Sequence, residues 1–142
     1  MTTSSHKDPA GYERVVIPSD LKAAKRPEHR ILHEVKRCRF SNEAIFAIRL
    51  ALEEAVTNAI KHGNRRDPSK QVLVRFKVCQ HQAEILVRDD GPGFHPNAVP
   101  DPTRDENIER PNGRGIMLMR AYMDDVSYND AGNEVRMIKV NR

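Results

Sequence analysis

The sequence has few of the residues that mark secreted, membrane-spanning or base-stacking proteins. It has two cysteines, no tryptophan and only 5% aromatic residues in 142 positions. Cys38 and Cys79 lie far apart without the spacing of a metal site, and we interpret them as reduced thiols. No apolar run approaches the ~20 residues of a membrane span, and residues 1–9 lack the apolar core of a signal peptide. These absences favour a cytoplasmic protein that does not insert into a membrane.

Charge of one sign is concentrated in one part of the chain. The net charge is +4, and seven of the 24 Lys and Arg residues lie between Lys22 and Arg39. A solvated helix face explains such a segment, and so does a docking surface for an acidic protein or for nucleic acid. Because aromatic residues that stack on bases are scarce, we favour the solvated face and expect no direct binding of nucleic acid.

The length is that of one domain with a single core. We expect a disordered lead over residues 1–11 and one domain over 12–142. Hydrophobic periodicity and stop signals predict an α+β sandwich with helices over one face of a sheet. The predicted strands are Tyr12–Ile17, Val72–Val78, Ala83–Asp89, Asp125–Asn129 and Glu134–Val140, and the predicted helices start at Ser19 or Asp20 (ending near Arg37), at Asn42 (ending at His62) and at Gly115 (ending at Met123).

The helix over residues 42–62 carries the first candidate site. Ser41 is its expected N-cap and Gly63 its stop. Glu54, Asn58 and His62 are spaced by four and share one stripe of a regular helix. An amide oxygen one turn from a carboxylate suits a hydrated Mg²⁺, with the carboxylate orienting a water or hydroxyl. A polar stripe that faces solvent fits the same spacing, and the adjacent Glu53 is the weaker candidate.

A second candidate follows the strand over residues 83–89. Asp89 shares a strand face with the apolar Ile85 and Val87, so its carboxylate points inward and needs a donor such as the amino group of a nucleobase. Gly91 and Gly93 allow a ligand to approach the backbone closely. Capping of an ordinary tight turn is the alternative for these three residues.

The third candidate lies beyond a proline-rich segment. Residues 94–112 have no usable period, and a loop of that length inside a domain is typical of a lid or of disorder. Gly113 and Gly115 then precede a helix, whose first amides can bind phosphate with charge added by Arg114 or Arg110. A glycine pair before a helix is common, so this pattern is weak by itself.

Together these segments resemble the nucleotide-binding motifs of GHKL-type (histidine kinase-like) ATPases. Residues 54–63, Glu-Ala-Val-Thr-Asn-Ala-Ile-Lys-His-Gly, resemble the N box; residues 87–94, Val-Arg-Asp-Asp-Gly-Pro-Gly-Phe, resemble the first glycine box; and residues 112–116, Asn-Gly-Arg-Gly-Ile, resemble the second. The motifs occur in the family order over nearly the whole chain, and the short chain is most similar to the anti-sigma-factor serine/threonine kinases. The resemblance implies a two-layer Bergerat-type sandwich with a mixed sheet.

The resemblance also implies roles for the site residues. Asn58 would coordinate Mg²⁺, Glu54 would be the catalytic base, and Asp89 would bind the adenine amino group of ATP. His62 would support the site or cap the helix. The residues expected to shape the pocket or contact phosphate are Gly91, Gly93, Arg110, Gly113, Arg114 and Gly115.

The function implied is phosphorylation of an anti-anti-sigma (STAS-type) partner together with sequestration of a sigma factor, in a homodimer. Two other functions fit the same motifs. One is a nucleotide-dependent partner-binding module without kinase activity. The other is the catalytic domain of a histidine kinase, which the 41 residues before Asn42 disfavour because they leave little room for a phosphoacceptor hairpin.

Overall fold

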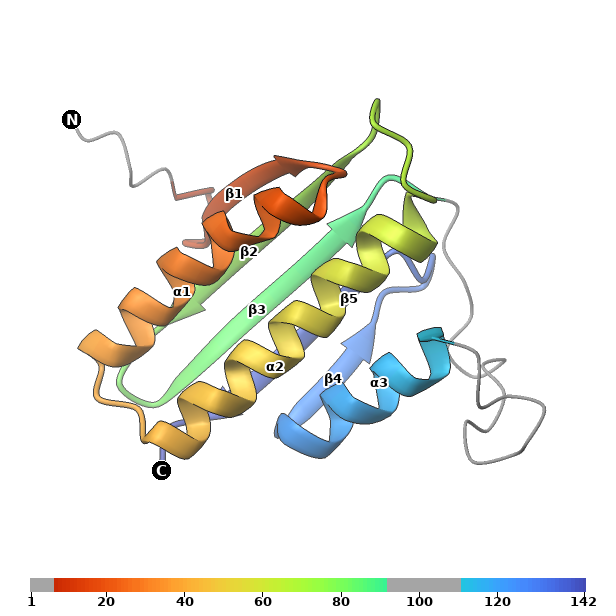
Figure 1. The fold of residues 1–142 in the computed structure, drawn as a ribbon. Helices are drawn as coiled ribbons and strands as arrows, with labels where there is room; N and C mark the ends of the chain where they lie inside the picture. Colours follow the sequence, from red (N-terminus) through yellow and green to blue (C-terminus); the bar gives the residue numbers. More distant parts are fainter. Residues whose placement is uncertain (1–6, 92–110) are drawn as a thin grey trace.

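The fold consists of a five-stranded sheet with helices over one face (Figure 1). The computed structural model describes residues 7–91 and 111–142, and the side chains of residues 111–116 lie outside that description. The elements are β1 (Glu13–Pro18), the short 3₁₀ helix η1 (Leu21–Ala24), α1 (Lys25–Arg37), α2 (Asn42–Asn58), the π-helical η2 (Ala59–Gly63), β2 (Gln71–Val78), β3 (Gln82–Asp89), α3 (Pro111–Tyr122), β4 (Asp125–Tyr128) and β5 (Glu134–Val140). The α+β sandwich is therefore confirmed.

The sheet has the order β1-β2-β3-β5-β4, and its four pairings are all antiparallel. The expected mixed sheet is therefore wrong for the described strands. Two successive helices, α1 and α2, connect β1 to β2 and return the chain to the end of the sheet where β1 finished. β4 runs in the same direction as β3, but the β4–β5 hairpin places β5 between them, so these two strands never pair.

Strand alternation builds the core. Val74 and Phe76 on β2 face the helices with Ile85 and Val87 on β3, as the period of two predicts. The helices close the core with Ile31 and Val35 from α1, Ile48, Leu52 and Val56 from α2, and Met119 from α3, all of them almost fully buried. This packing fixes α2 across the middle of the sheet (Figure 1), with its last turn at one end of the layer.

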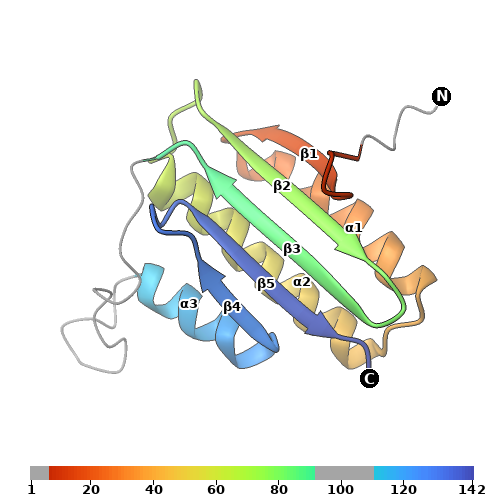
Figure 2. The ribbon, with the colours of Figure 1, turned by 180° about the vertical axis from the view of Figure 1, so that it is seen from behind.

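The opposite face of the sheet, over which none of the described helices lies (Figure 2), carries ion pairs. Arg75 pairs with Asp8 and with Glu134, and Arg136 pairs with Glu84. Residues 8–12, at the end of the segment expected to be a disordered lead, form a turn in which Asp8 accepts hydrogen bonds from the backbone of Ala10 and Tyr12. Residues 1–6 of that lead are outside the described part of the chain.

The first helix begins later than predicted. Asp20 is a cap, as expected, because its carboxylate accepts from the amide of Lys22 at 2.9 Å. The capped element is the 3₁₀ helix η1, however, and α1 starts only at Lys25. Pro27 explains the shift: an α-helix that began at Leu21 would need an amide hydrogen from Pro27, whereas in the first turn of α1 none is needed.

The last helix begins earlier than predicted. α3 starts at Pro111, a residue suited to the first helical position because its φ is fixed and its missing donor costs nothing there. The two glycines at 113 and 115 therefore lie inside the helix, and the interpretation of them as a break before it is wrong. Pro111 and Asn112, expected as the end of the lid, form the first turn, and residues 94–110 of that lid are outside the described part of the chain.

Candidate functional site

The C-terminal end of α2 changes from α-helix to π-helix where the predicted site begins. α2 is regular as far as Asn58, and residues 59–63 form one wider turn closed by a hydrogen bond from Asn64 N to Ala59 O at 2.8 Å. Glu54 and Asn58 share one stripe of the helix, as predicted. His62 lies on the wider turn, and spacing in the sequence does not predict this change of helix type. Single π turns are frequent at functional sites.

Two polar atoms on this segment are buried without a partner. Asn58 Nδ2 and His62 Nε2 have no hydrogen-bond partner among the described residues. A buried polar atom of this kind costs free energy, about 1–3 kcal/mol each, unless something else satisfies it. Burial, aided by Lys61 and Arg66, lowers the pKa of His62, so its imidazole is neutral at pH 7. The end of α2 therefore has unfilled hydrogen-bonding capacity, as a ligand site requires.

The structure separates the two adjacent carboxylates of α2. Glu53 is directed toward α1, where the Glu28 carboxyl forms a side-chain hydrogen bond with it. Burial and this neighbouring carboxylate raise the pKa of Glu28. Glu54 is half-buried and lies one turn before Asn58 on the same stripe. Of the two, Glu54 is the one placed to act beside Asn58.

Asp89 ends β3 on the face that the helices cover. It stands opposite Val72 in the sheet, and its Oδ1 accepts a hydrogen bond from Gly91 N at 2.7 Å. Burial raises the pKa of Asp89, with a smaller contribution from Asp90, while the Gly91 amide opposes the rise. The inward orientation predicted from strand alternation is confirmed. The alternative, capping of the turn, is also present, because the inward-pointing Asp89 carboxylate accepts from Gly91 N.

Two glycines bring these segments into contact. A Cβ atom added to Gly63 would overlap the Asp89 carboxyl, and one added to Gly91 would overlap the carbonyl of Gly63. Residues 63, 89 and 91 therefore touch only because two of them lack side chains. The π turn and the loop after β3 meet at this junction. The Asp89 carboxylate lies against Gly63, the residue that follows His62 in the chain.

Tyr128 is a neighbour of this junction that the sequence did not reveal. On β4 it pairs with Val135, which pairs in turn with Val87 of β3, two residues before Asp89. Burial raises the pKa of Tyr128 to about 12, and the charge of Asp89 adds to that rise. The signal was available in the alternation of β4, where Val126 and Tyr128 fall on the inner face.

The start of α3 lies toward the C-terminal end of α2, which carries Asn58 (Figure 1). The Phe46 and Tyr122 rings meet edge-on at 6.0 Å, so the start of α2 is beside the end of α3 and the two helices run antiparallel (Figure 1). The first amides of a helix have no acceptor within it, so the first turn of α3 offers donors at the site end. Gly113, Arg114 and Gly115 lie in this helix but their surroundings are not described, and Gly93 and Arg110 fall outside the described residues.

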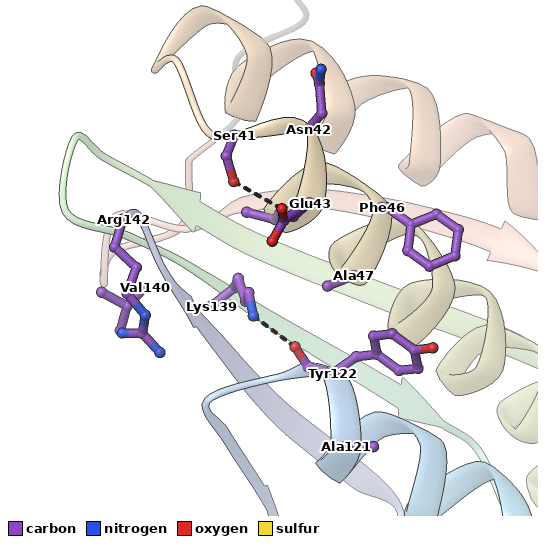
Figure 3. Close-up of a pocket in the computed structure, with 11 residues that line it drawn as sticks. Ser41, Asn42, Glu43, Phe46, Ala47, Ala121, Tyr122, Lys139, Val140 and Arg142 are labelled. Carbon is purple, nitrogen blue, oxygen red and sulfur yellow. Dashed lines mark hydrogen bonds between the residues drawn. The ribbon is translucent and has the colours of Figure 1, made fainter.

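A cavity of about 560 Å³ lies at the other end of α2 (Figure 3). Phe46 and Tyr122 line it, and Lys139 crosses it to donate to the carbonyl of Tyr122 at 2.8 Å. Val140, also in its lining, pairs with Gln82 at the end of β3 opposite Asp89. Because α2 has 17 residues, about 25 Å separates its two ends. This cavity is therefore distinct from the cluster around Asn58 and Asp89.

The cluster fits a hydrated metal better than a metal held by protein alone. Within residues 7–91 and 111–142 no group of three or more His, Cys, Asp or Glu side chains is placed to hold an ion. Mg²⁺ usually keeps several waters and takes one or two protein oxygens together with phosphate oxygens. Asn58, with its amide nitrogen buried and unpartnered, suits that role. No helix in the described part of the chain is long and apolar enough to cross a membrane.

Comparison with protein families gives an independent result. Residues 17–139 match the model of the histidine kinase-like ATPase domain. The chain is 32% identical over 110 residues to the serine-protein kinase RsbW of Listeria monocytogenes, which covers 72% of this chain and 70% of that protein. It is 35% identical over 103 residues to an anti-sigma F factor of Clostridium perfringens, covering 68% of this chain and 73% of that protein.

A solved structure supports the fold. The structure of the RsbU and RsbW domains of a Mycobacterium tuberculosis protein superposes on 92% of this chain with a TM-score of 0.61. This chain spans about a third of that larger chain, 32%. At 14% identity the likeness shows the shared fold alone.

Proposed function

Because this chain belongs to the histidine kinase-like ATPase family, within which it is of the anti-sigma serine kinase type, we propose that its site binds ATP with Mg²⁺ and phosphorylates a serine or threonine of a partner protein. The partner proposed is a STAS-type anti-anti-sigma protein. The same chain would bind a sigma factor, in keeping with the name of the anti-sigma F relatives.

The proposal gives each end of the site a separate task. The Asp89 carboxylate accepts a hydrogen bond from the amino group of adenine, while the Gly91 amide holds that carboxylate in place. Asn58 offers its amide oxygen to Mg²⁺, and its buried nitrogen gains a partner from the bound nucleotide or its water. The bound metal supplies charge neutralisation for the phosphates. The first amides of α3 donate to phosphate oxygens, with Arg110 or Arg114 as proposed additional charges.

Glu54 acts on the attacking hydroxyl. In the transfer, the bond between the γ-phosphorus and the bridging oxygen of ADP breaks, and a bond to the serine or threonine oxygen forms. Glu54 accepts the proton of that hydroxyl, or orients the hydroxyl for attack. His62, neutral at pH 7 because of its lowered pKa, serves as a hydrogen-bonding neighbour rather than as a second cation.

One observation carries this proposal. His62 Nε2 belongs to the residue before Gly63, which meets Asp89, and Asn58 Nδ2 lies on the last turn of α2 just before this segment; both atoms are buried without a partner among the described residues. A polar stripe that merely faced solvent would not bury such atoms. This arrangement disfavours the solvent-facing alternative for the Glu54–His62 stripe and fits a nucleotide site.

Calorimetric titration tests the nucleotide site directly. Wild-type protein is titrated with ATP and ADP, with and without Mg²⁺, beside Asp89→Asn and, as a matched control, Asp90→Asn. Asp90 Oδ2 accepts from Gln71 N at 2.8 Å and is exposed, so its substitution should spare the base contact. We expect Mg²⁺-dependent binding that Asp89→Asn abolishes and Asp90→Asn retains. No binding by the wild type would refute the ATP site.

The face of α1 is the proposed docking surface for the sigma factor. Its exposed residues at helical spacing are Arg26, His29, His33 and Lys36, here called the basic face of α1. A surface of this sign meets acidic partners and accelerates association with them. We also propose a homodimer and a cytoplasmic location, which suit a regulator of transcription initiation.

A further inference from the structure

Asn64, directly after the π turn, is a fully buried polar residue at 0% exposure. In the sequence it only follows Gly63, the predicted stop of the helix. In the structure its side chain uses its hydrogen-bonding groups on three different segments. Nδ2 donates to Ser19 Oγ at 2.7 Å and to Gln71 O at 2.9 Å, and Oδ1 accepts from Asp90 N at 2.7 Å.

These bonds connect the loop after β3 to the end of α2. Asp90 N belongs to the residue that follows Asp89, so the acceptor at Asn64 fixes the backbone directly beyond the Asp89 carboxylate. The backbone of Asn64 is itself held by the bond to Ala59 that closes the π turn. Asn64 thus connects by hydrogen bonds the residue that follows Asn58 with the residue that follows Asp89.

Among the described residues of the loop, up to Gly91, the remaining hydrogen bonds do not reach α2. Asp90 Oδ2 accepts from Gln71 N, which ties the loop to β2, and Asp89 Oδ1 accepts from Gly91 N within the loop. Gly63 touches Asp89 but supplies packing without a directional bond. Packing sets how close the two segments lie, whereas the Asn64 amide sets where the loop sits along the contact.

Only a carboxamide satisfies all three partners. Two of them, Ser19 Oγ and the Gln71 carbonyl, accept hydrogen bonds from Nδ2. The third, Asp90 N, donates a hydrogen bond to Oδ1. Aspartate would place a carboxylate oxygen against the Gln71 carbonyl, and alanine would leave the Asp90 amide without this acceptor. The residue type is therefore determined by the geometry of the loop.

We infer that Asn64 is a positioning residue for base specificity: it holds the Asp89–Gly91 loop in register with the end of α2, so that the Asp89 carboxylate selects the amino group of adenine. This inference rests on the proposed ATP site. A carboxylate at the correct position accepts from that amino group and opposes the carbonyl oxygen that replaces it in inosine triphosphate (ITP). The ratio of ATP to ITP affinity therefore reports the position of Asp89.

The experiment measures that ratio by calorimetry with Mg²⁺ in the full chain, for the wild type, Asn64→Ala and Asn64→Gln. Alanine removes the amide, and glutamine keeps its chemistry but displaces it by one methylene group. We expect the ATP-to-ITP ratio to fall about tenfold or more in both variants, because displacements near 1 Å carry large penalties in such sites. Melting temperatures, measured in parallel, establish that the variants are folded.

Val35→Ala is the matched control for lost stability. Val35 is fully buried in the last turns of α1. The following Cys38 carbonyl accepts from Asn141 Nδ2, which also donates to Gln80 O, at the end of β3 opposite Asp89. This variant should melt at a lower temperature and keep the wild-type ratio.

Each outcome separates the inference from the proposed function. If a folded Asn64 variant keeps a ratio within twofold of the wild type, Asn64 is only a structural residue and the inference is wrong. If the wild type binds no ATP, the proposed function fails first. If neither Asn64 variant folds, Ser19→Ala removes one of the two acceptors that orient the Asn64 amide toward Asp90 N; the ratio should then fall, and an unchanged ratio in that variant overturns the inference.

Discussion

Gly63 lies directly against the carboxylate of Asp89, although 26 residues separate them and one ends a helix while the other ends a strand. The contact leaves no room for even a methyl group on residue 63. It joins the segment that we propose binds Mg²⁺ to the segment that we propose reads the base. The two halves of the site are therefore mechanically one unit.

Gly63→Ala should disrupt this unit. The added methyl group must displace the Asp89 carboxylate, and we expect ATP affinity to fall about 10²-fold or more, with an overpacking cost of about 1–3 kcal/mol in stability. The control is Gly11→Ala. Gly11 has a φ of +89° in a turn on the other face of the sheet, so this substitution is also strained but lies away from the site. Calorimetry and thermal melting measure both variants, and an ATP affinity that Gly63→Ala leaves intact would contradict the contact.

Glu54→Ala should separate binding from transfer. The variant is expected to bind ATP normally and to transfer the phosphoryl group about 10²–10⁴-fold more slowly, the usual effect of losing a general base. Glu53→Ala is a close control, since it removes the neighbouring carboxylate that faces Glu28. Transfer of labelled phosphate to a STAS-type protein is the assay. Equal rates in the two variants would show that Glu54 has no special role.

Asn58→Ala should remove the effect of Mg²⁺ on ATP affinity without lowering the stability of the apo protein. The substitution removes a buried amide nitrogen that has no partner among the described residues, and alanine favours the helix. We therefore expect an apo melting temperature equal to or above that of the wild type. The increase in ATP affinity that Mg²⁺ provides should disappear. Titrations with and without Mg²⁺ decide the point, and a retained Mg²⁺ effect assigns the metal to another residue.

Local signals in the sequence predicted much of the fold. Ser41 caps α2 as expected by accepting from Ala44 N at 3.1 Å, and β5 has the predicted bounds of Glu134–Val140. Caps and strand alternation depend on neighbours in the chain, so they can be read from a single sequence. The strand order depends on which partner the β4–β5 hairpin meets, and this long-range choice made the expected mixed sheet wrong.

The site was predictable to the same extent. The inward orientation of Asp89 follows from the period of two, and the structure brings it to the end of α2. The π turn that carries His62 could not be predicted, because it forms where α2 meets the loop after β3. Asn64 was missed for the same reason: its three partners lie 45, 7 and 26 residues away in the chain.

Glu28→Gln should stabilise the protein at neutral pH. The pKa of Glu28 is raised by burial and by Glu53, so this group binds a proton more tightly in the folded state than in the unfolded state. The contribution of Glu28 to the stability of the folded state is complete below the ordinary glutamate pKa of 4.5. It is lost as the pH rises through the higher pKa of Glu28 in the folded state. Glutamine keeps a hydrogen bond to Glu53 without the repulsion.

The expected gain is up to about 1 kcal/mol at pH 7, as for a partly exposed charge pair, and it should vanish below pH 4. Urea unfolding at several pH values measures it. Glu43→Gln, at an exposed position in the first turn of α2, is the control and should show no such gain. A benefit of Glu28→Gln that persisted unchanged in acid would mean that the Glu28–Glu53 contact does not cause it.

Charge reversal on the basic face of α1 should weaken the sigma-factor complex and spare the enzyme. Arg26 and Lys36 are exposed and lie on one side of α1. The double variant Arg26→Glu/Lys36→Glu should associate with an acidic partner at least about tenfold more slowly than the wild type at low salt, because exposed charges act mainly on the rate of association.

Added salt should narrow the difference in association rate between the variant and the wild type, since salt screens charges beyond about 10 Å at 0.1 M. ATP affinity should not change. Surface binding kinetics across a salt series measure the effect, and association that is insensitive to both the reversal and the salt would place the docking surface elsewhere on the molecule.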